Sequence, residues 1–336
     1  MIGVTMSNLG VGLDVGTMNL VAGRFDGDKV VTKRMRDAFL DLPKSAQKVL
    51  KLSQAAYVER NDEILLLGDQ ALELASVFGR EARRPLSGGL IAAGELEAMD
   101  VLGYMIKELL GEPRVKGEHC YYSIPAAPVD NLSRDVIYHK RVFEKIVSQC
   151  GFTATPSNEA MAIIYAEGAK DNFSALAFSF GSGMTNVALG YAAVETMSFS
   201  VERGGDWVDS GAARSVGATA SRMCSIKEAG VDLANPTTRE QEAIAYYYRE
   251  LIQHALEWTA AEFKRRGLSQ TVTKPLPIIV SGGTSTAKGF LDIFKSVLDR
   301  QRKKLGLEIS EVRAAAEPFD GVARGLLVQA NQEHAE

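Results

Sequence analysis

A strand, a glycine-rich turn and a returning strand occur twice in this chain, and this repeat constrains the fold most strongly. Residues 9–15 and 20–25 flank the first turn, and residues 175–180 and 187–191 flank the second. Superposing the two turns matches Asn19 with Asn186 and requires one or two inserted residues in the second. Each copy begins a half-chain of domain size within 336 residues. The repeat predicts an α/β protein with two related domains that face each other across a cleft.

Apolar spacing predicts the helices between and after the two copies. Helical periodicity covers residues 95–110, 134–150, 158–168 and 243–266, and a buried strand is expected at 276–280. The first domain is expected to span residues 1–160, with a small inserted subdomain at about 26–84. The second domain is expected to span 161–336, with an insertion at about 215–275.

Composition excludes several classes of function. The net charge of −4 comes from 38 basic and 42 acidic residues spread along the chain, so no basic stripe favours a nucleic acid partner. Three separated cysteines and four histidines indicate neither a zinc site nor a disulfide framework. Residues 1–9 lack a basic stretch and a long apolar run, and no later segment is long enough to cross a bilayer. A cytoplasmic protein is expected.

The two turns have the composition of a phosphate-binding site. Glycine permits backbone angles that point successive N–H groups in one direction, and such a concavity binds phosphate oxygens. A single turn of this kind is more simply an ordinary hairpin turn. Two of them, followed by Gly282 and Gly283 after a third strand, favour a polyphosphate and a nucleoside. Asp14 ends a buried strand beside the first turn, where a hydrated Mg²⁺ would balance its charge; the alternative is a turn-capping aspartate.

Five segments, taken in order, resemble one protein superfamily. Residues 12–17 (GLDVGT) and 180–185 (FGSGMT) resemble the two phosphate motifs of actins, Hsp70 chaperones and sugar kinases, and residues 280–284 (VSGGT) resemble their adenosine motif. Residues 84–92 (RPLSGGLIA) and 203–206 (RGGD) are similar to segments of the bacterial actins of the MreB and MamK type. The motifs are short, but their order extends over nearly the whole chain.

This resemblance implies an actin-like ATPase fold, with two duplicated ribonuclease H-like domains facing a nucleotide cleft. It implies ATP or ADP and Mg²⁺ as cofactors, with Asp14 holding the metal through water and acting with Glu159 in catalysis. It also assigns ligand-binding residues. The phosphates would be bound by Gly16, Thr17, Met18, Asn19, Gly181, Ser182, Gly183, Met184 and Thr185, and the nucleoside by Gly204, Lys227, Glu228, Gly282, Gly283 and Thr284.

Two positions bear directly on hydrolysis. Residues 158–162 (NEAMA) resemble the connecting helix that reads Glu-Glu-Pro-Met-Ala in MreB, and this match implies that Glu159 orients or deprotonates the attacking water. Without the motif, Glu159 would be interpreted as a residue that interacts with the helix dipole. Ser179 stands where the family's second motif begins with aspartate. A neutral serine is a poorer partner for Mg²⁺, so either hydrolysis is slow or another carboxylate substitutes.

The favoured hypothesis is a cytoskeletal ATPase that polymerises head to tail with itself in a nucleotide-dependent manner, with cargo and adaptor proteins unknown. The alternative is a monomeric nucleotide-dependent regulator or chaperone-like reactivating factor, because fold alone does not determine function. A small-molecule kinase is less favoured, since no acidic base for a sugar hydroxyl is evident. Membrane contact is not indicated: Val77, Phe78 and Leu86 either form an exposed loop or are buried in the small subdomain.

Overall fold

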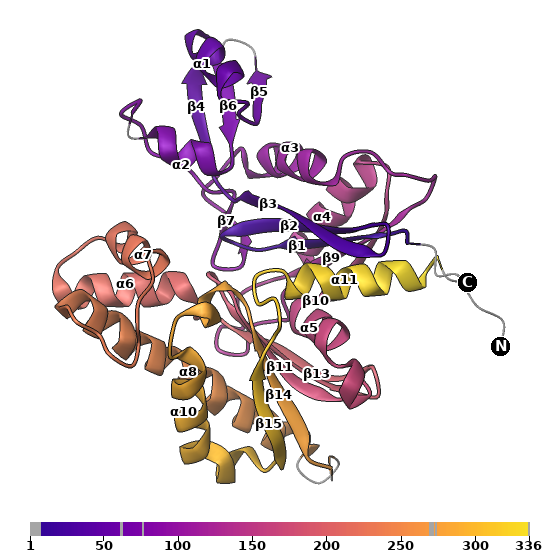
Figure 1. Ribbon diagram of the computed structural model, residues 1–336, viewed down its shortest axis with the longest axis vertical. Helices are drawn as coiled ribbons and strands as arrows, with labels where there is room; N and C mark the ends of the chain where they lie inside the picture. Colours follow the sequence, from indigo (N-terminus) through magenta and orange to yellow (C-terminus); the bar gives the residue numbers. More distant parts are fainter. Residues whose placement is uncertain (1–7, 61–62, 76, 269–271, 273, 335–336) are drawn as a thin grey trace. The chain divides into compact units, whose positions relative to one another are not determined.

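The computed structural model describes residues 8–60, 63–75, 77–268, 272 and 274–334, which form two compact units (Figure 1). Unit 1 contains the described residues up to Ile124, Val136–Ser157, and those from Leu326 onward. Unit 2 contains Pro125–Asp135 and the described part of Asn158–Gly325. Each unit is therefore assembled from separated segments of the chain.

The first sheet has five strands in the order β10-β9-β1-β2-β3. Strand β1 pairs antiparallel with β2 and parallel with β9, and β3 extends the sheet beyond β2. The strand bounds are β1 (Val11–Val15), β2 (Asn19–Asp26), β3 (Lys29–Arg36), β9 (His119–Ile124) and β10 (Thr153–Asn158). Strand β1 is buried along almost its whole length, which explains its run of apolar residues and glycine.

The second sheet repeats this topology in the order β13-β12-β11-β14-β15. Its central strand β11 pairs antiparallel with β12 and parallel with β14, as β1 does with β2 and β9. The strand bounds are β11 (Ala175–Phe180), β12 (Thr185–Tyr191), β13 (Val194–Val201), β14 (Leu276–Ser281) and β15 (Ile309–Ala314). The duplicated α/β fold predicted from the two hairpins is confirmed.

The two hairpin turns have equal length, which corrects the alignment made from sequence. The Gly16 amide donates to the Asn19 carbonyl at 3.1 Å, and the Gly181 amide donates to the Met184 carbonyl at 3.0 Å. Each turn therefore has two central residues and needs no insertion. The sequence alignment matched Asn19 with Asn186, whereas Asn19 corresponds to Met184.

Helices cover both sheets, mostly where the periodicity predicts them. In unit 1, α3 (Ala98–Leu110) and α4 (Ile137–Gln149) pack on the first sheet. The expected start of α3 at residue 95 is wrong, because Leu96 precedes the helix and is 97% exposed. The other long helices are α5 (Glu159–Glu167), α6 (Gly205–Val216), α7 (Ala220–Glu228), α8 (Arg239–Arg266), α10 (Phe290–Leu305) and α11 (Gly321–Gln332), with short 3₁₀ turns at η1 (Lys44–Ala46), η2 (Ala169–Asp171) and η3 (Gly283–Thr286).

A small separate sheet occupies part of the segment assigned to an insertion at about 26–84. Strand β3 of that segment belongs to the first sheet, whereas β4 (Phe39–Pro43), β6 (Glu63–Leu67) and β5 (Tyr57–Arg60) form a sheet of their own. Its apolar side chains make a core distinct from that of the first sheet. The segment also contains α1 (Gln47–Leu52) and α2 (Asp69–Ala75), and a two-stranded ribbon of β7 (Leu86–Ser87) and β8 (Leu90–Ile91) follows it.

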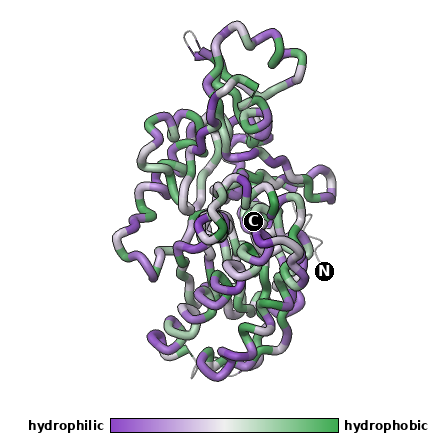
Figure 2. The backbone as a smooth tube through the Cα atoms, turned by 90° about the vertical axis from the view of Figure 1, so that its left-hand side faces the viewer, coloured by the Kyte–Doolittle hydropathy of each residue, from purple (hydrophilic) through white to green (hydrophobic). Residues whose placement is uncertain are grey.

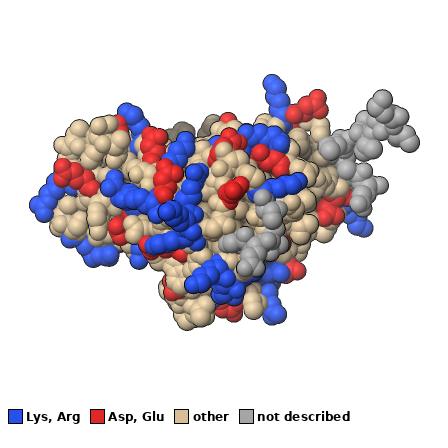
Figure 3. All heavy atoms as spheres, turned by 90° about the horizontal axis from the view of Figure 1, so that it is seen from below, with Lys and Arg blue, Asp and Glu red and all other residues tan. Residues whose placement is uncertain are grey.

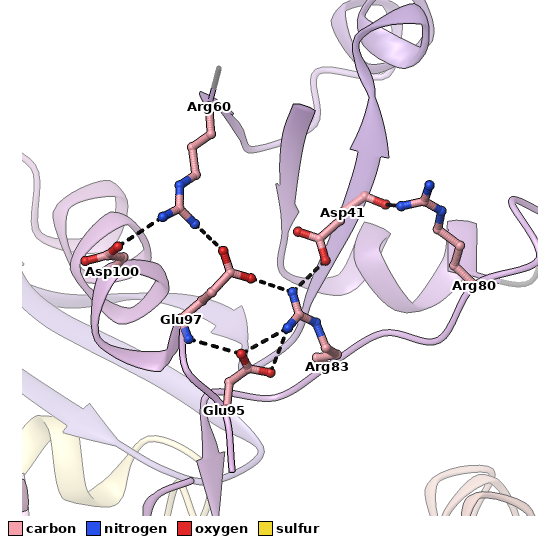
Figure 4. A network of polar contacts seen from close by, with 7 residues as sticks. All are labelled: Asp41, Arg60, Arg80, Arg83, Glu95, Glu97 and Asp100. Carbon is pink, nitrogen blue, oxygen red and sulfur yellow. Dashed lines mark hydrogen bonds and ion pairs between the residues drawn. The ribbon is translucent and has the colours of Figure 1, made fainter. Parts of the chain in front are cut away.

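Arg83 ties the small sheet to the residues before α3 (Figure 4). Its guanidinium donates to Asp41 on β4 at 2.5 Å, to both carboxylate oxygens of Glu95, and to Glu97 at 2.6 Å. It also lies 4.3 Å from the centre of the Phe39 ring. These carboxylates hold the pKa of Arg83 above its usual value, although its burial opposes the shift. The planar donor fork of arginine suits this many-sided contact better than lysine would.

Hydrophobic and hydrophilic residues occur in short stretches along the chain. Hydrophobic and hydrophilic residues alternate along much of the backbone (Figure 2), and no helix among the described residues is long and apolar enough to span a membrane. Most of the terminal stretch 1–9 lies outside the described residues. Of the suggested apolar loop, Val77 is 72% exposed, but Leu86 is buried and Phe78 packs on the small sheet's core.

Charged side chains of both signs are interspersed on the face drawn in Figure 3. At the end of α8, Arg265 and Arg266 both pair with Glu262. Basic residues in the last turn of a helix also interact favourably with its dipole. The basic cluster at residues 264–266 is therefore explained by its own helix end.

The packing of α11 on α5 generates a stability prediction. A Cβ atom added at Gly325 would lie 1.7 Å from the Ala162 carbonyl oxygen. We expect Gly325→Ala to lower the free energy of unfolding by about 3 kcal/mol, because the helices must separate. Gly103→Ala in α3 is the control, since its Cβ would meet nothing within 4 Å, and should be neutral or stabilising. Equal effects of both variants in urea unfolding would contradict this packing.

Candidate functional site

Asp14 lies at the end of β1, immediately before the first turn, and its orientation is set by Ser123. The Ser123 hydroxyl donates to Asp14 Oδ1 at 3.0 Å and accepts a hydrogen bond from the Val15 amide at 2.7 Å. Ser123 is on β9, the parallel neighbour of β1, and is buried. A half-buried carboxylate therefore sits beside the turn with one oxygen held by a hydroxyl. Such a group is suited to contact the water shell of a divalent cation.

The first turn is braced from outside by the segment at residues 84–92. The Gly89 amide donates to Thr17 Oγ1 at 3.0 Å, and an Arg84 guanidinium nitrogen lies 3.3 Å from Met18 Sδ. The Asp37 amide donates to the Met18 carbonyl at 3.0 Å. Thr17 is only 5% exposed, so the turn can offer a ligand mainly its backbone groups.

The second turn lies in a hairpin that carries no acidic residue from position 175 to 191. Ser179, which occupies the position equivalent to Asp14, is 4% exposed and is neutral. The Thr185 hydroxyl donates inward to the Arg203 carbonyl at 2.8 Å, and the Met184 side chain is buried. The Ser182 hydroxyl is buried and has no hydrogen-bond partner among the described residues. A buried hydroxyl without a partner is costly, and a phosphate oxygen would satisfy it.

Backbone from three segments converges on this second turn. The Gly205 amide and the Thr284 hydroxyl both donate to the Gly181 carbonyl, at 3.0 and 2.9 Å. A Cβ at Gly204 would lie 2.4 Å from the Ser182 carbonyl oxygen. Gly282 has φ +97°, and a Cβ there would lie 2.4 Å from the Phe180 carbonyl oxygen, so both conformation and space require glycine. The sequence-predicted residues Gly204, Gly282, Gly283 and Thr284 are therefore brought together around residues 181–183.

Lys227 reaches the same place through a buried ion pair. Its ammonium group donates to the Gly205 carbonyl at 3.0 Å and to Asp209 Oδ2 at 2.8 Å. Burial raises the pKa of the Asp209 carboxyl above its usual value, and the charge of Lys227 opposes that shift. Glu228, by contrast, is exposed at the end of α7.

Glu159 is the first residue of α5, and the helix start is fixed by Asn158. The Asn158 side chain caps the helix by accepting from the amides of Ala160 and Met161, at 2.9 and 3.1 Å. Glu159 Oε2 accepts a hydrogen bond from Asn186 Nδ2 at 2.9 Å. Asn186 immediately follows Thr185, so Glu159 is directly linked to the strand that leaves the second turn.

Three functional contacts were missed from the sequence. Ser123 and Asn186 act on Asp14 and Glu159 through side chains 109 and 27 positions away, and such distances leave no local pattern. Asp209 was visible three residues after the Gly-Gly-Asp stretch, but its pairing with Lys227 was not predicted. The signal for Asn186 was its place directly after a glycine-rich turn.

Comparisons with known proteins agree with this architecture. The family model described as Volactin matches residues 9–330. No curated protein matches the chain. The structure described as "MamK double helical filament" is 18% identical, with a TM-score of 0.70 over 96% of this chain and 98% of that one.

Two further solved structures share the fold. MreB5 of Spiroplasma citri bound to AMPPNP is 14% identical, with a TM-score of 0.65 over 95% of each chain. The ethanolamine utilization protein EutJ from Carboxydothermus hydrogenoformans is 18% identical, with a TM-score of 0.56 over 95% of this chain and 89% of that one. At these identities the likeness establishes the actin-like fold.

The buried ion pair predicts a pH-dependent loss of stability. We expect Lys227→Met to lower the free energy of unfolding by about 3–5 kcal/mol near pH 8, because it leaves the ionised Asp209 buried without its cation. Asp209 already has a raised folded-state pKa, so the ionised form opposes folding. The loss should shrink as the pH falls through that pKa, since the protonated carboxyl costs less to bury.

Urea unfolding at pH 5 and pH 8 measures this effect. Lys170→Met is the matched control, because Lys170 is 61% exposed in its pair with Glu311 and should cost less than about 1 kcal/mol at either pH. A loss for Lys227→Met that stays constant with pH would show that Asp209 does not depend on this cation.

Proposed function

Because this chain belongs to the volactin family of actin-like proteins, we propose that it binds ATP and assembles head to tail into filaments in a nucleotide-dependent manner. The observation that carries the nucleotide part is the pair of equal turns. Each turn ends the central strand of one of two duplicated sheets, and each is closed by a glycine amide. Each turn offers backbone donors of the kind that bind phosphate oxygens.

The residues at the turns fit ATP and magnesium. The buried Ser182 hydroxyl would gain an acceptor from a phosphate oxygen, and the half-buried Asp14 carboxylate would contact the water shell of Mg²⁺. Gly204, Gly282 and Thr284, with Lys227 beside them, would line the nucleoside end. Bound Mg²⁺ would supply positive charge to the phosphates as negative charge shifts during hydrolysis. The related protein MreB5 of Spiroplasma citri has been solved bound to AMPPNP and bound to ADP.

Hydrolysis of ATP to ADP and phosphate belongs to the same proposal, at a low rate. Glu159, held by Asn186, would orient or deprotonate the attacking water. The hairpin at residues 175–191 has no acidic residue. Ser179 stands where the family's second motif has an aspartate, whose carboxylate would contact the water shell of Mg²⁺. Nucleotide affinity depends less on that carboxylate than turnover does, so binding would survive while hydrolysis is slow.

Filament assembly is supported by the fold shared with the structure described as "MamK double helical filament". Identical subunits that add head to tail without closing a ring form a filament. The monomeric regulator is the second candidate, since the same fold occurs in EutJ, an ethanolamine utilization protein. The filament-forming protein and the monomeric regulator would share this fold. They would differ in whether the surface of the protein supports self-assembly.

Negative-stain electron microscopy tests assembly directly. The purified protein is imaged with Mg-ATP, with Mg-ADP and without nucleotide at several concentrations. We expect filaments with Mg-ATP and fewer or none without nucleotide. Asp14→Ala should lose Mg²⁺-dependent ATP affinity and with it the filaments, because the metal's carboxylate partner is removed. Single particles in every condition, at concentrations where ATP is bound, would favour the monomeric regulator.

A second prediction concerns Ser179. If the missing carboxylate limits turnover, Ser179→Asp should raise the rate of phosphate release, by about tenfold for each 1.4 kcal/mol gained in the transition state. Ser198→Asp is the control, because Ser198 lies on β13, which β12 separates from β11, and its partner Ala188 lies beyond the turn. Phosphate release at saturating Mg-ATP is the measurement. An unchanged rate for Ser179→Asp would mean that the missing carboxylate does not limit turnover.

A further inference from the structure

We propose that Asn186 is a positioning residue that keeps the Glu159 carboxylate ionised and couples it to the second turn. This inference rests on the proposed hydrolysis, in which Glu159 acts on the attacking water. It assigns a role to a residue that the phosphate-motif resemblance leaves outside the site. The role depends on the two hydrogen bonds that the Asn186 amide makes.

The geometry leaves the Asn186 amide one orientation. Its Oδ1 accepts from the Ala126 amide at 3.1 Å, and its Nδ2 donates to Glu159 Oε2 at 2.9 Å. The Ala126 N–H can only donate, so the oxygen end of the Asn186 amide must face it. The NH₂ end, which can also only donate, must then face Glu159. A donor held in this position favours the ionised carboxylate over the protonated one.

The support behind Asn186 is rigid. Asn186 is 1% exposed on β12 and is in register with Ser200 on β13. The Ser200 hydroxyl donates to the Ala126 carbonyl at 2.8 Å. The side chains of Asn186 and Ser200 therefore bind the amide and the carbonyl of Ala126. The Ser200 amide also donates to the Ala127 carbonyl, and Pro128 forms a bridge with Ser200. The backbone donor that orients Asn186 is thus itself fixed to the sheet.

The position of Asn186 in the strand provides the coupling to the turn. It follows Thr185, whose backbone pairs with Phe180 across the base of the second hairpin. The same buried strand therefore fixes the position of the Glu159 carboxylate relative to the second turn.

A purely structural role for Asn186 makes different predictions. A buried asparagine that only satisfies the Ala126 amide would affect stability and leave the pH dependence of hydrolysis unchanged. A residue that acts on the charge of Glu159 must alter that pH dependence. Replacement of the NH₂ donor by a second carboxylate is the sharpest change, because two carboxylates in contact cannot both ionise easily.

The test is the pH profile of ATP hydrolysis for the wild type and two variants. For Asn186→Asp we expect the pH of half-maximal kcat to rise by about one unit or more. For Asn186→Ala we expect kcat to fall by about tenfold or more, because the carboxylate is no longer aimed, and a smaller rise in that pH, because the carboxylate loses its donor. The Kd for Mg-ATP should change less than about twofold in either variant, since the phosphate ligands remain.

Asn331→Asp is the matched control for burying a new carboxylate. Asn331 is 4% exposed and donates to the Leu9 carbonyl at 3.0 Å, and it has no place in the candidate site. Its variant should keep the wild-type pH profile. Wild-type profiles for both Asn186 variants, with kcat within about twofold, would overturn the inference.

A second readout separates this inference from the proposed hydrolysis. Glutamate side chains labelled with ¹³C at Cδ report each carboxyl's titration by NMR, and the Glu159 signal is assigned by its loss in Glu159→Gln. We expect Glu159 to titrate at higher pH in Asn186→Asp than in the wild type. Wild-type protein that fails to hydrolyse ATP would contradict the proposed function. An unchanged Glu159 titration would by itself overturn the inference.

Discussion

In both units, a hydrogen bond from a glycine amide to the carbonyl three residues later closes the turn on which the site depends. At Gly16 and Gly181 there is little space for a side chain, because a Cβ would lie 2.8 and 3.1 Å from the carbonyl oxygens of Asn19 and Met184. This hydrogen bond holds the two strands of each hairpin together at the turn, where we propose that backbone amides contact phosphate. Each turn then stays at the end of the buried central strand of its sheet, which limits its movement.

The two turns are alike in closure but differ in what surrounds them. The first has a carboxylate, Asp14, held by Ser123, and is braced by side chains and by the segment at residues 84–92. The second has no acidic residue in its hairpin and is packed closely by backbone at Gly204 and Gly282. A duplicated fold has thus diverged into one half that offers negative charge and one that offers close backbone approach and a buried hydroxyl.

Local patterns predicted much of this arrangement. The hairpin strands, the α5 helix between Asn158 and Gly168, and the glycine turn after β14 follow from periodicity and from residues with strong conformational preferences. The start of α3 did not, because Leu96 fits the helical spacing but lies outside the helix. The equal length of the two turns was also missed, since side-chain identity at Asn19 and Asn186 suggested a false match. Backbone closure, which sequence does not display, decides that alignment.

Long-range contacts account for the rest of what the sequence could not predict. Ser123, Asn186 and the four-way contact of Arg83 depend on partners brought together by strand order, and each was an ordinary polar residue in the sequence. These residues orient the groups that motifs identify. Resemblance to known motifs therefore identifies the candidate functional groups. The residues that hold those groups in place are found only in the structure.

A structure of the protein with Mg²⁺ and a non-hydrolysable ATP analogue would show whether both glycine-closed turns bind phosphate, as we propose. We expect phosphate oxygens within hydrogen-bond distance of backbone amides in residues 16–19 and in residues 181–185, with the Ser182 hydroxyl donating to one of them. A nucleotide bound with its phosphates against only one turn, or away from both, would contradict the proposal.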